Sequence, residues 1–206
     1  MILAASEQKS TMRRFRTTVL FLLFSLLVFQ QCRKKNPDPP APPAPPVPGP
    51  VVIKDSVIVQ GLQFPWEILW GPDNFIWMTE RGGKISRVNP ATGAVTLLHT
   101  IPDAVSTGEG GLLGMVLHPQ FSSNPYVYVS YNYNSGGYRE KIVRFTYTGS
   151  ALTSPVPLIE NITASSIHNG SRLLISPDLK LFATTGDASN TALPQNTSSV
   201  NGRFYG

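Results

Sequence analysis

Cysteine is nearly absent from this sequence: Cys32 is the only one in 206 residues, and charged residues make up only 14% of the chain. A single cysteine excludes an internal disulfide and any zinc site built on paired cysteines. The sequence also has no His-Glu-x-x-His segment, no acidic loop of the EF-hand type and no glycine-rich nucleotide-binding motif. These absences argue against zinc chemistry and against hydride transfer to a nicotinamide cofactor.

Residues 51–206 have no excess of charge of either sign. Lysine and arginine outnumber aspartate and glutamate by 17 to 12, for a net charge of +5. The excess of cations falls within the first 50 residues, so that residues 51–206 carry ten cations and ten anions. A neutral region without a basic stripe gives no support for nucleic-acid binding.

The first 50 residues have the composition of a leader and not of a folded domain. A basic start around Arg13 and Arg14 precedes an apolar run of 13 residues, 17–29. Such a run rises about 20 Å as a helix, which is short for a membrane span and typical of a signal peptide. We therefore expect residues 1–31 to be a signal peptide.

Cys32 lies just after that apolar run. A lone cysteine in this place resembles the lipidated cysteine of a bacterial lipoprotein. The residues before it, Gln30 and Gln31, depart from the small residue that usually precedes such a cysteine. An ordinary signal peptide, or an uncleaved anchor beside an unmodified thiol, is the alternative. Lipidation of Cys32 would place an exported protein at the periplasmic side of a membrane or at the cell surface.

Residues 32–50 are predicted to form a spacer. Nine of the fourteen residues from 37 to 50 are proline. Proline-rich segments adopt an extended polyproline II conformation of about 3.1 Å per residue, so this one would reach roughly 40 Å. It would hold the domain that follows away from a membrane.

Helical periodicity is missing from residues 51–206, which predicts an all-β fold. No stretch of eleven or more residues has apolar side chains at helical spacing. Short runs rich in β-branched and aromatic residues alternate instead with Gly, Pro, Asn and Asp, as in strands joined by turns. The predicted strands are 57–59, 75–78, 85–88, 95–98, 126–129, 142–145 and 181–184.

A loose repeat indicates the kind of all-β fold. Three apolar segments are each followed by a turn with a proline, Pro72, Pro119 or Pro177, and then by a second apolar strand. The spacing of 47 and 58 residues is typical of β-propeller blades. About three such blades fit into 51–206. Because three blades make an incomplete arc, we expect this region to be the N-terminal part of a longer propeller protein, truncated before its later blades.

The most informative polar segment is 166–174, with His168 in a glycine-containing turn just before an apolar strand. A turn of this kind can hold a proton acceptor at the end of a rigid sheet. Imidazole suits that role because its ordinary pKa, about 6.5, leaves it a free base near neutral pH. A histidine that only stabilises the turn is the alternative interpretation.

Three blocks of sequence, in the same order, resemble the glucose/sorbosone dehydrogenase family. They are 61–85, then 108–121 with GEGGLLG and HPQF, then 168–187 with HNGSRL, PD and TGD. Members of this family are quinoprotein sugar dehydrogenases with a six-bladed propeller. The resemblance implies pyrroloquinoline quinone (PQQ) as cofactor, calcium as a second one, and oxidation of an aldose at C1 to the lactone.

The resemblance also implies residue roles. His168 matches the family's general base, which takes the proton of the anomeric hydroxyl while hydride leaves for PQQ, and Glu109 matches a position near the substrate hydroxyl. Because Glu109 lies beside glycines, a turn residue that faces solvent is the alternative interpretation. The residues that hold PQQ and calcium come from later blades, so activity is expected only of the full-length protein. The glucose enzymes have aspartate where this chain has Ile167, which leaves the sugar undetermined. The electron acceptor is unknown.

Other functions fit the same sequence. One is a non-catalytic, surface-anchored propeller that binds carbohydrate or protein, since fold does not fix function. Another is an inactive fragment. Among the remaining polar residues, we expect Arg172 to bond turn carbonyls and Asp187 to be a turn residue, with a place at the cofactor mouth and a site role as their respective alternatives. We expect His118 to pack at a corner and His99 to be exposed.

Overall fold

The structure is a computed structural model that describes residues 53–205. The chain divides into two units, Met1–Ile53 and Lys54–Gly206, and the second is the one described below. The predicted signal peptide, Cys32 and the tether therefore lie outside the described residues. Within the described range the chain forms eleven strands and no helix, which confirms the all-β prediction. Over the same range, no helix is long and apolar enough to span a membrane.

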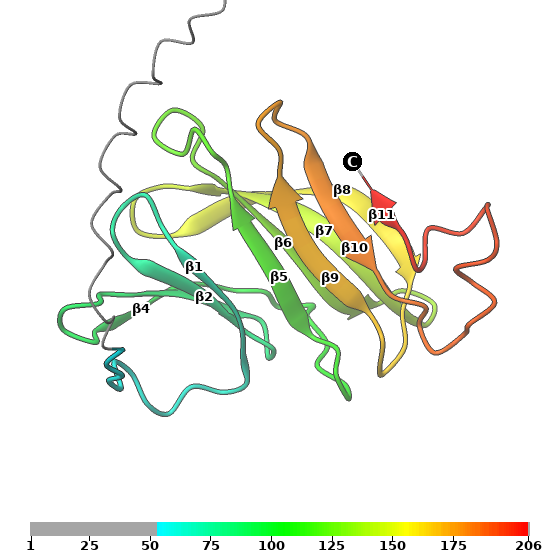
Figure 1. Ribbon diagram of the computed structural model, residues 1–206, viewed down its shortest axis with the longest axis horizontal. Helices are drawn as coiled ribbons and strands as arrows, with labels where there is room; N and C mark the ends of the chain where they lie inside the picture. Colours follow the sequence, from blue (N-terminus) through cyan, green and yellow to red (C-terminus); the bar gives the residue numbers. More distant parts are fainter. Residues whose placement is uncertain (1–52, 206) are drawn as a thin grey trace, which may run out of the picture. The chain divides into compact units, whose positions relative to one another are not determined.

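The strands form three antiparallel sheets that follow one another along the chain (Figure 1). The first sheet contains β1 (Pro65–Trp70), β2 (Ile76–Glu80), β3 (Lys84–Val88) and β4 (Val95–Thr100) in sequence order. The second contains β5 (Leu112–Leu117), β6 (Tyr126–Asn134), β7 (Tyr138–Tyr147) and β8 (Leu152–Thr163), also in sequence order. The third contains β9 (Gly170–Ile175), β10 (Leu181–Thr185) and β11 (Phe204–Tyr205).

The predicted repeat of strand, proline turn and strand is present as the first hairpin of each sheet. In the first sheet, the N–H of Gly71 donates to the carbonyl of Phe75 at 2.8 Å and closes the turn between β1 and β2. The second and third sheets have turns at the same place, between β5 and β6 and between β9 and β10. Proline fits these turns because its fixed φ matches the turn conformation. Its missing backbone N–H costs no sheet hydrogen bond at these positions.

Three strand predictions differ from the structure, and one of them is the short β11, which was not predicted. Residues 57–59 form no strand, and Val57 is largely exposed. The longest strand, β8, was not predicted, because Pro155 and Pro157 lie inside it. β8 is an edge strand paired only with β7, and an edge is where a sheet tolerates proline.

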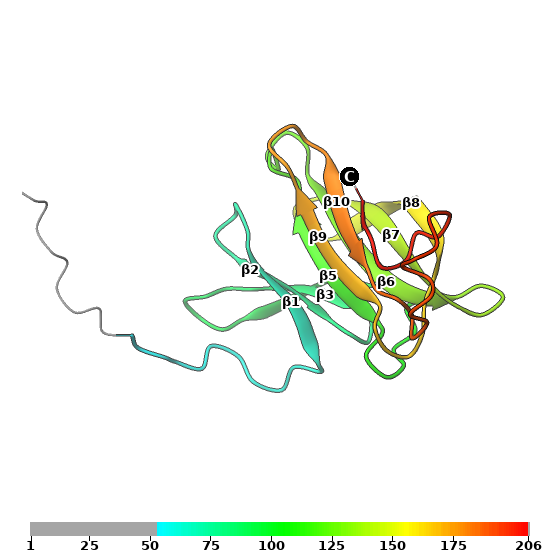
Figure 2. The same cartoon turned by 45° about the vertical axis from the view of Figure 1, so that its right-hand side comes forward.

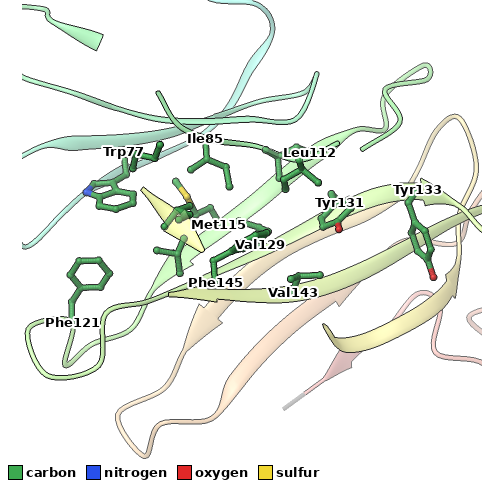
Figure 3. Close-up of a cluster of buried hydrophobic side chains, with 14 residues drawn as sticks. Trp77, Ile85, Leu112, Met115, Phe121, Val129, Tyr131, Tyr133, Val143 and Phe145 are labelled. Atoms are coloured by element: carbon green, nitrogen blue, oxygen red, sulfur yellow. The ribbon is translucent and has the colours of Figure 1, made fainter. Parts of the chain in front are cut away.

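The main hydrophobic core lies between the first and second sheets (Figure 3). Trp77 of β2 is fully buried there, with its ring 5.7 Å from that of Phe121 and 5.1 Å from that of Tyr147. Such edge-on aromatic contacts add to the large apolar area that a buried tryptophan removes from water. A second, smaller core of Ile142, Leu173 and Ala183 joins the second sheet to the third.

The second sheet therefore has an apolar core on both faces and lies between the other two sheets, as Figures 1 and 2 show. Its first strand, β5, lies against β1 on one side and β9 on the other. This arrangement brings together the segments that lead into β5 and β9. The candidate site is built from those segments.

Candidate active site

The two residues predicted for the site lie just before neighbouring strands. Glu109 is in the segment that leads into β5, and His168 is two residues before β9. Asp187 follows the end of β10 by two residues. Because β9 and β10 are antiparallel partners, the residue before one and the residue after the other meet at the same edge. Asp187 thus joins the site through sheet topology.

The backbone and the ring of His168 are each held by a carboxylate. Its N–H donates to Oε2 of Glu109 at 3.0 Å, and its ring Nδ1 lies 3.1 Å from Oδ1 of Asp187. An ionised carboxylate can only accept a hydrogen bond, so Nδ1 carries the proton in this contact. Nε2 of the neutral ring is then an acceptor, on a side chain that is 56% exposed.

The carboxylate of Asp187 is itself held in place by the backbone. Its Oδ1 also accepts the N–H of Ser189 at 2.9 Å, in a local turn. Asp187 was expected to be a turn residue, and it does make that turn. The same oxygen contacts His168, which the local pattern did not show.

Backbone contacts fix the His168 turn between the two neighbouring segments. The carbonyl of His168 accepts the N–H of Ala188 at 3.2 Å, and the carbonyl of Asn169 accepts the N–H of Gly186 at 2.8 Å. His168 has a positive φ of 60°, a conformation that is uncommon for residues other than glycine. Gly186 is packed so tightly that a Cβ on it would overlap the carbonyl of His168.

Arg81, at the end of β2, holds the segment that carries Glu109. Its Nε donates to the carbonyl of Gly110 at 3.2 Å, and its second terminal nitrogen donates to that same carbonyl at 3.0 Å. The latter nitrogen also bonds the carbonyl of Gly108. The N–H of Glu109 donates to the carbonyl of Ser166 at 2.6 Å, so this segment is fastened to the His168 turn as well.

Arg172 differs from its expectation. Instead of bonding turn carbonyls, its guanidinium contacts both carboxylate oxygens of Glu67, at 2.8 and 2.7 Å. Glu67 is on β1 and only 4% exposed, whereas the side chain of Arg172 on β9 is 61% exposed. The pair therefore links β1 and β9, the first strands of the first and third sheets. A sequence separation of 105 residues hides such a pair from sequence analysis.

The other two histidines lie away from this site. Nδ1 of His118 accepts the N–H of Gln120 at 3.1 Å, a corner contact of the kind expected. His99 was expected to be exposed but is half-buried, with its ring 5.0 Å from that of Phe145. Burial lowers the pKa of His99.

The residues at this edge fit a proton-transfer site better than a cation or cofactor clamp. Among residues 53–205, no three or more His, Cys, Asp or Glu side chains group in a way that could hold a metal ion. The charged side chains that contact His168 are carboxylates, Glu109 and Asp187. These groups attract hydroxyl protons and a protonated imidazole, whereas they repel the carboxylates of an anionic quinone.

Three antiparallel sheets in series, with a histidine held between two carboxylates close to the ends of β5, β9 and β10, define an all-β protein with a candidate acid–base site. Residues 62–205 match the family described as Glucose / Sorbosone dehydrogenase. The chain belongs to the glucose/sorbosone dehydrogenase family.

Several relatives support this placement. Quinoprotein glucose dehydrogenase B of Acinetobacter calcoaceticus is 41% identical over 150 residues, which is 67% of this chain and 31% of the relative. The structure of the PQQ-bound aldose sugar dehydrogenase of Streptomyces coelicolor superimposes with a TM-score of 0.67 at 33% identity, covering 72% of this chain and 46% of that one.

A glucose dehydrogenase described as a putative oxidoreductase, from Thermus thermophilus, gives a TM-score of 0.66 at 32% identity, over 71% of this chain and 45% of that one. The chain thus spans between about a third and a half of the length of these relatives.

Proposed function

We propose that this chain is the N-terminal part of a sugar oxidoreductase that oxidises an aldose at C1 to its lactone, with PQQ as cofactor. Family membership and the names of the relatives support the class of reaction. The observation that carries the proposal is the geometry of His168. Its Nδ1 is paired with Asp187, which leaves Nε2 as an accessible proton acceptor.

In this proposal His168 is the general base. Nε2 takes the proton of the anomeric hydroxyl, and the imidazolium that forms is stabilised by the carboxylate of Asp187 at 3.1 Å. The same contact keeps the ring in one tautomer and one orientation. When bound, PQQ supplies the two-electron acceptor that takes up the hydride from C1.

Glu109 has a second role in the same step. One of its oxygens, Oε2, holds the backbone of His168. We propose that its other oxygen, Oε1, accepts a hydrogen bond from a substrate hydroxyl and so sets the distance between the sugar and His168. Ile167, which is 38% exposed beside them, offers the sugar an apolar surface where glucose enzymes offer a carboxylate.

The three sheets are, in this proposal, consecutive blades of an incomplete arc of a six-bladed propeller. Large apolar side chains on β1 and β9 are exposed: Ile68 by 70%, Trp70 by 64% and Leu174 by 57%. Exposed apolar surface of this kind is typical of a face that other elements cover. Further blades would cover it, and would supply the cations for PQQ and the calcium ligands.

We also propose export and anchoring. Residues 1–31 would be removed as a signal peptide, Cys32 would be lipidated, and residues 32–50 would tether the sheets at the periplasmic side or the cell surface. Labelling of cells with a radioactive fatty acid tests this: the label should enter the wild-type protein and be absent from a Cys32→Ala variant.

The catalytic proposal is tested with the complete gene product, reconstituted with PQQ and calcium and supplied with a panel of aldoses and a reducible dye. His168→Gln should lower kcat by about 10² to 10⁴, the usual contribution of a general base. His118→Gln is the matched control and should keep wild-type turnover. An absence of dye reduction, with or without added PQQ, would favour the non-catalytic propeller or an inactive fragment. Unchanged turnover in His168→Gln would remove His168 from the mechanism.

A further inference from the structure

The second sheet contains two buried polar side chains that the proposed reaction does not use. Asn132 on β6 and Glu140 on β7 are opposite each other in the strand register, with exposures of 0% and 1%. Directly opposed residues of antiparallel strands lie on the same face of the sheet. Burying an amide and a carboxyl is costly unless both are hydrogen-bonded. Their partners are therefore informative.

Asn132 is bonded to the segment that carries Glu109. The side-chain Oδ1 of Asn132 accepts the N–H of Gly111 at 3.0 Å, and the backbone N–H of Asn132 donates to the carbonyl of Gly111, also at 3.0 Å. Its carbonyl accepts the N–H of Val105 at 2.9 Å. Three hydrogen bonds from one residue thus fasten both ends of the segment, on either side of Glu109.

Glu140 is bonded to the segment that carries His168. Its Oε1 accepts hydrogen bonds from two hydroxyls, Ser130 of its own sheet at 2.5 Å and Ser171 of β9 at 2.7 Å. Ser171 is fully buried and has a positive φ of 76°. A non-glycine residue in that conformation carries strain of about 1 kcal/mol or more, so it needs such a partner to persist.

Together these bonds run from one face of the second sheet to both halves of the candidate site. We propose that Asn132 and Glu140 form a positioning pair, which sets the position of the Glu109 segment relative to the His168 turn. The contact between Oε2 of Glu109 and the N–H of His168 then follows from the spacing of two opposed residues in a rigid hairpin. The positioning role rests on the proposed function, but the contact itself can be measured without any activity.

Two matched serine variants of the 206-residue chain test the Glu140 half. Ser171→Ala and Ser130→Ala each remove one hydroxyl from the same carboxylate oxygen, and both serines are fully buried. Only Ser171, the second residue of β9, directly follows the His168 turn. Ser171→Ala should speed amide hydrogen exchange at His168 and Ala188 by about fivefold or more, as expected for a lost hydrogen bond. Ser130→Ala should change these rates by less than about twofold.

The second readout is the tautomer of His168, from the nitrogen chemical shifts of its ring. Wild type and Ser130→Ala should hold the Nδ1–H tautomer that Asp187 favours, whereas Ser171→Ala should show a mixture of the two tautomers. Glu140→Gln keeps the acceptor oxygen and should resemble wild type, and Glu140→Leu should resemble Ser171→Ala. A purely structural role would not separate these variants by tautomer.

Asn132 is tested through its own segment. Asn132→Leu should speed exchange at the amide of Gly111 by about fivefold or more, and Asn132→Asp, which keeps the accepting oxygen, should stay within about twofold of wild type. Equal effects of Ser130→Ala and Ser171→Ala, or an unchanged His168 in both, would overturn the positioning pair. Failure of the proposed oxidation would show in the dye assay alone and would leave these rates as described.

Discussion

Gly114 of β5 lies against the backbone of β9, so that an alanine there would force the two sheets apart. A Cβ built on Gly114 would overlap the carbonyl oxygen of Ser171 and come within 3.5 Å of Cγ of Leu173. Real Cβ atoms essentially never come closer than 3.0 Å to another heavy atom, so one of the strands would have to move by about 1 Å. The obstacle is backbone, which cannot swing aside as a side chain does.

The expected cost of Gly114→Ala follows from that shift. Overpacking of a dense interior costs about 1 to 3 kcal/mol, and a strand that must move against a backbone belongs at the upper end. For a domain of roughly 150 residues, about 3 kcal/mol lowers Tm by about 6 to 12 °C. Thermal unfolding followed by circular dichroism measures it.

Gly82→Ala is the matched control, because nothing lies within 4 Å of its added Cβ and its φ is not positive. Its stability should stay within about 1 kcal/mol of wild type, with a small gain if the lost flexibility of the unfolded chain dominates. If Gly114→Ala unfolds within about 2 °C of wild type, β5 and β9 do not approach as described. A matching loss in Gly82→Ala would mean that the assay reports something other than this contact.

Three further outcomes are expected. Burial raises the pKa of Glu140 from an ordinary 4.5 to about 7. Between these two values the folded state holds a proton that the unfolded state releases. The free energy of unfolding should therefore fall by about 3 kcal/mol as pH rises from the lower value to the higher one. Urea unfolding at pH 5 and pH 8 should show this fall in wild type and not in Glu140→Gln; parallel curves would contradict it. Arg172→Met should lower the free energy of unfolding by about 1 to 3 kcal/mol, because it leaves the buried carboxylate of Glu67 without its ion-pair partner. Adding Glu67→Gln should recover most of that loss, which a double-mutant cycle would measure. Gly186→Ala should displace the carbonyl of His168 and lower kcat of the complete protein by about 10². Turnover is measured well below the Tm of the variant. Unaltered turnover would show that the turn tolerates the methyl group.

Much of the fold could be predicted from local sequence, and β8 shows where local sequence is not sufficient. β-branched and aromatic runs placed β3, β4 and β6, because such residues favour strands and turn residues lie on either side of each run. β8 was missed because Pro155 and Pro157 weaken any local strand signal. Its position at the edge of the sheet, which makes the prolines tolerable, is a property of the assembled sheet.

The candidate site was only partly predictable for the same reason. The turn around His168 and the glycines around Glu109 could be recognised as motifs, because each lies within one short segment. For Asp187 the local sequence favoured a turn residue, which it is, over the alternative of a site residue. Its contact with the His168 ring depends on the antiparallel pairing of β9 with β10.

The sequence by itself determined the strand pattern, the repeat of proline turns, the family and the histidine turn, since each depends on residues close together in the chain. Tertiary structure decided which side chains meet: Glu109 with His168 across 59 residues, Glu67 with Arg172 across 105, and Glu140 with Ser171 across 31. The partner of a buried carboxylate is set by how whole sheets pack, because only the assembled sheets bring its donor within hydrogen-bonding distance.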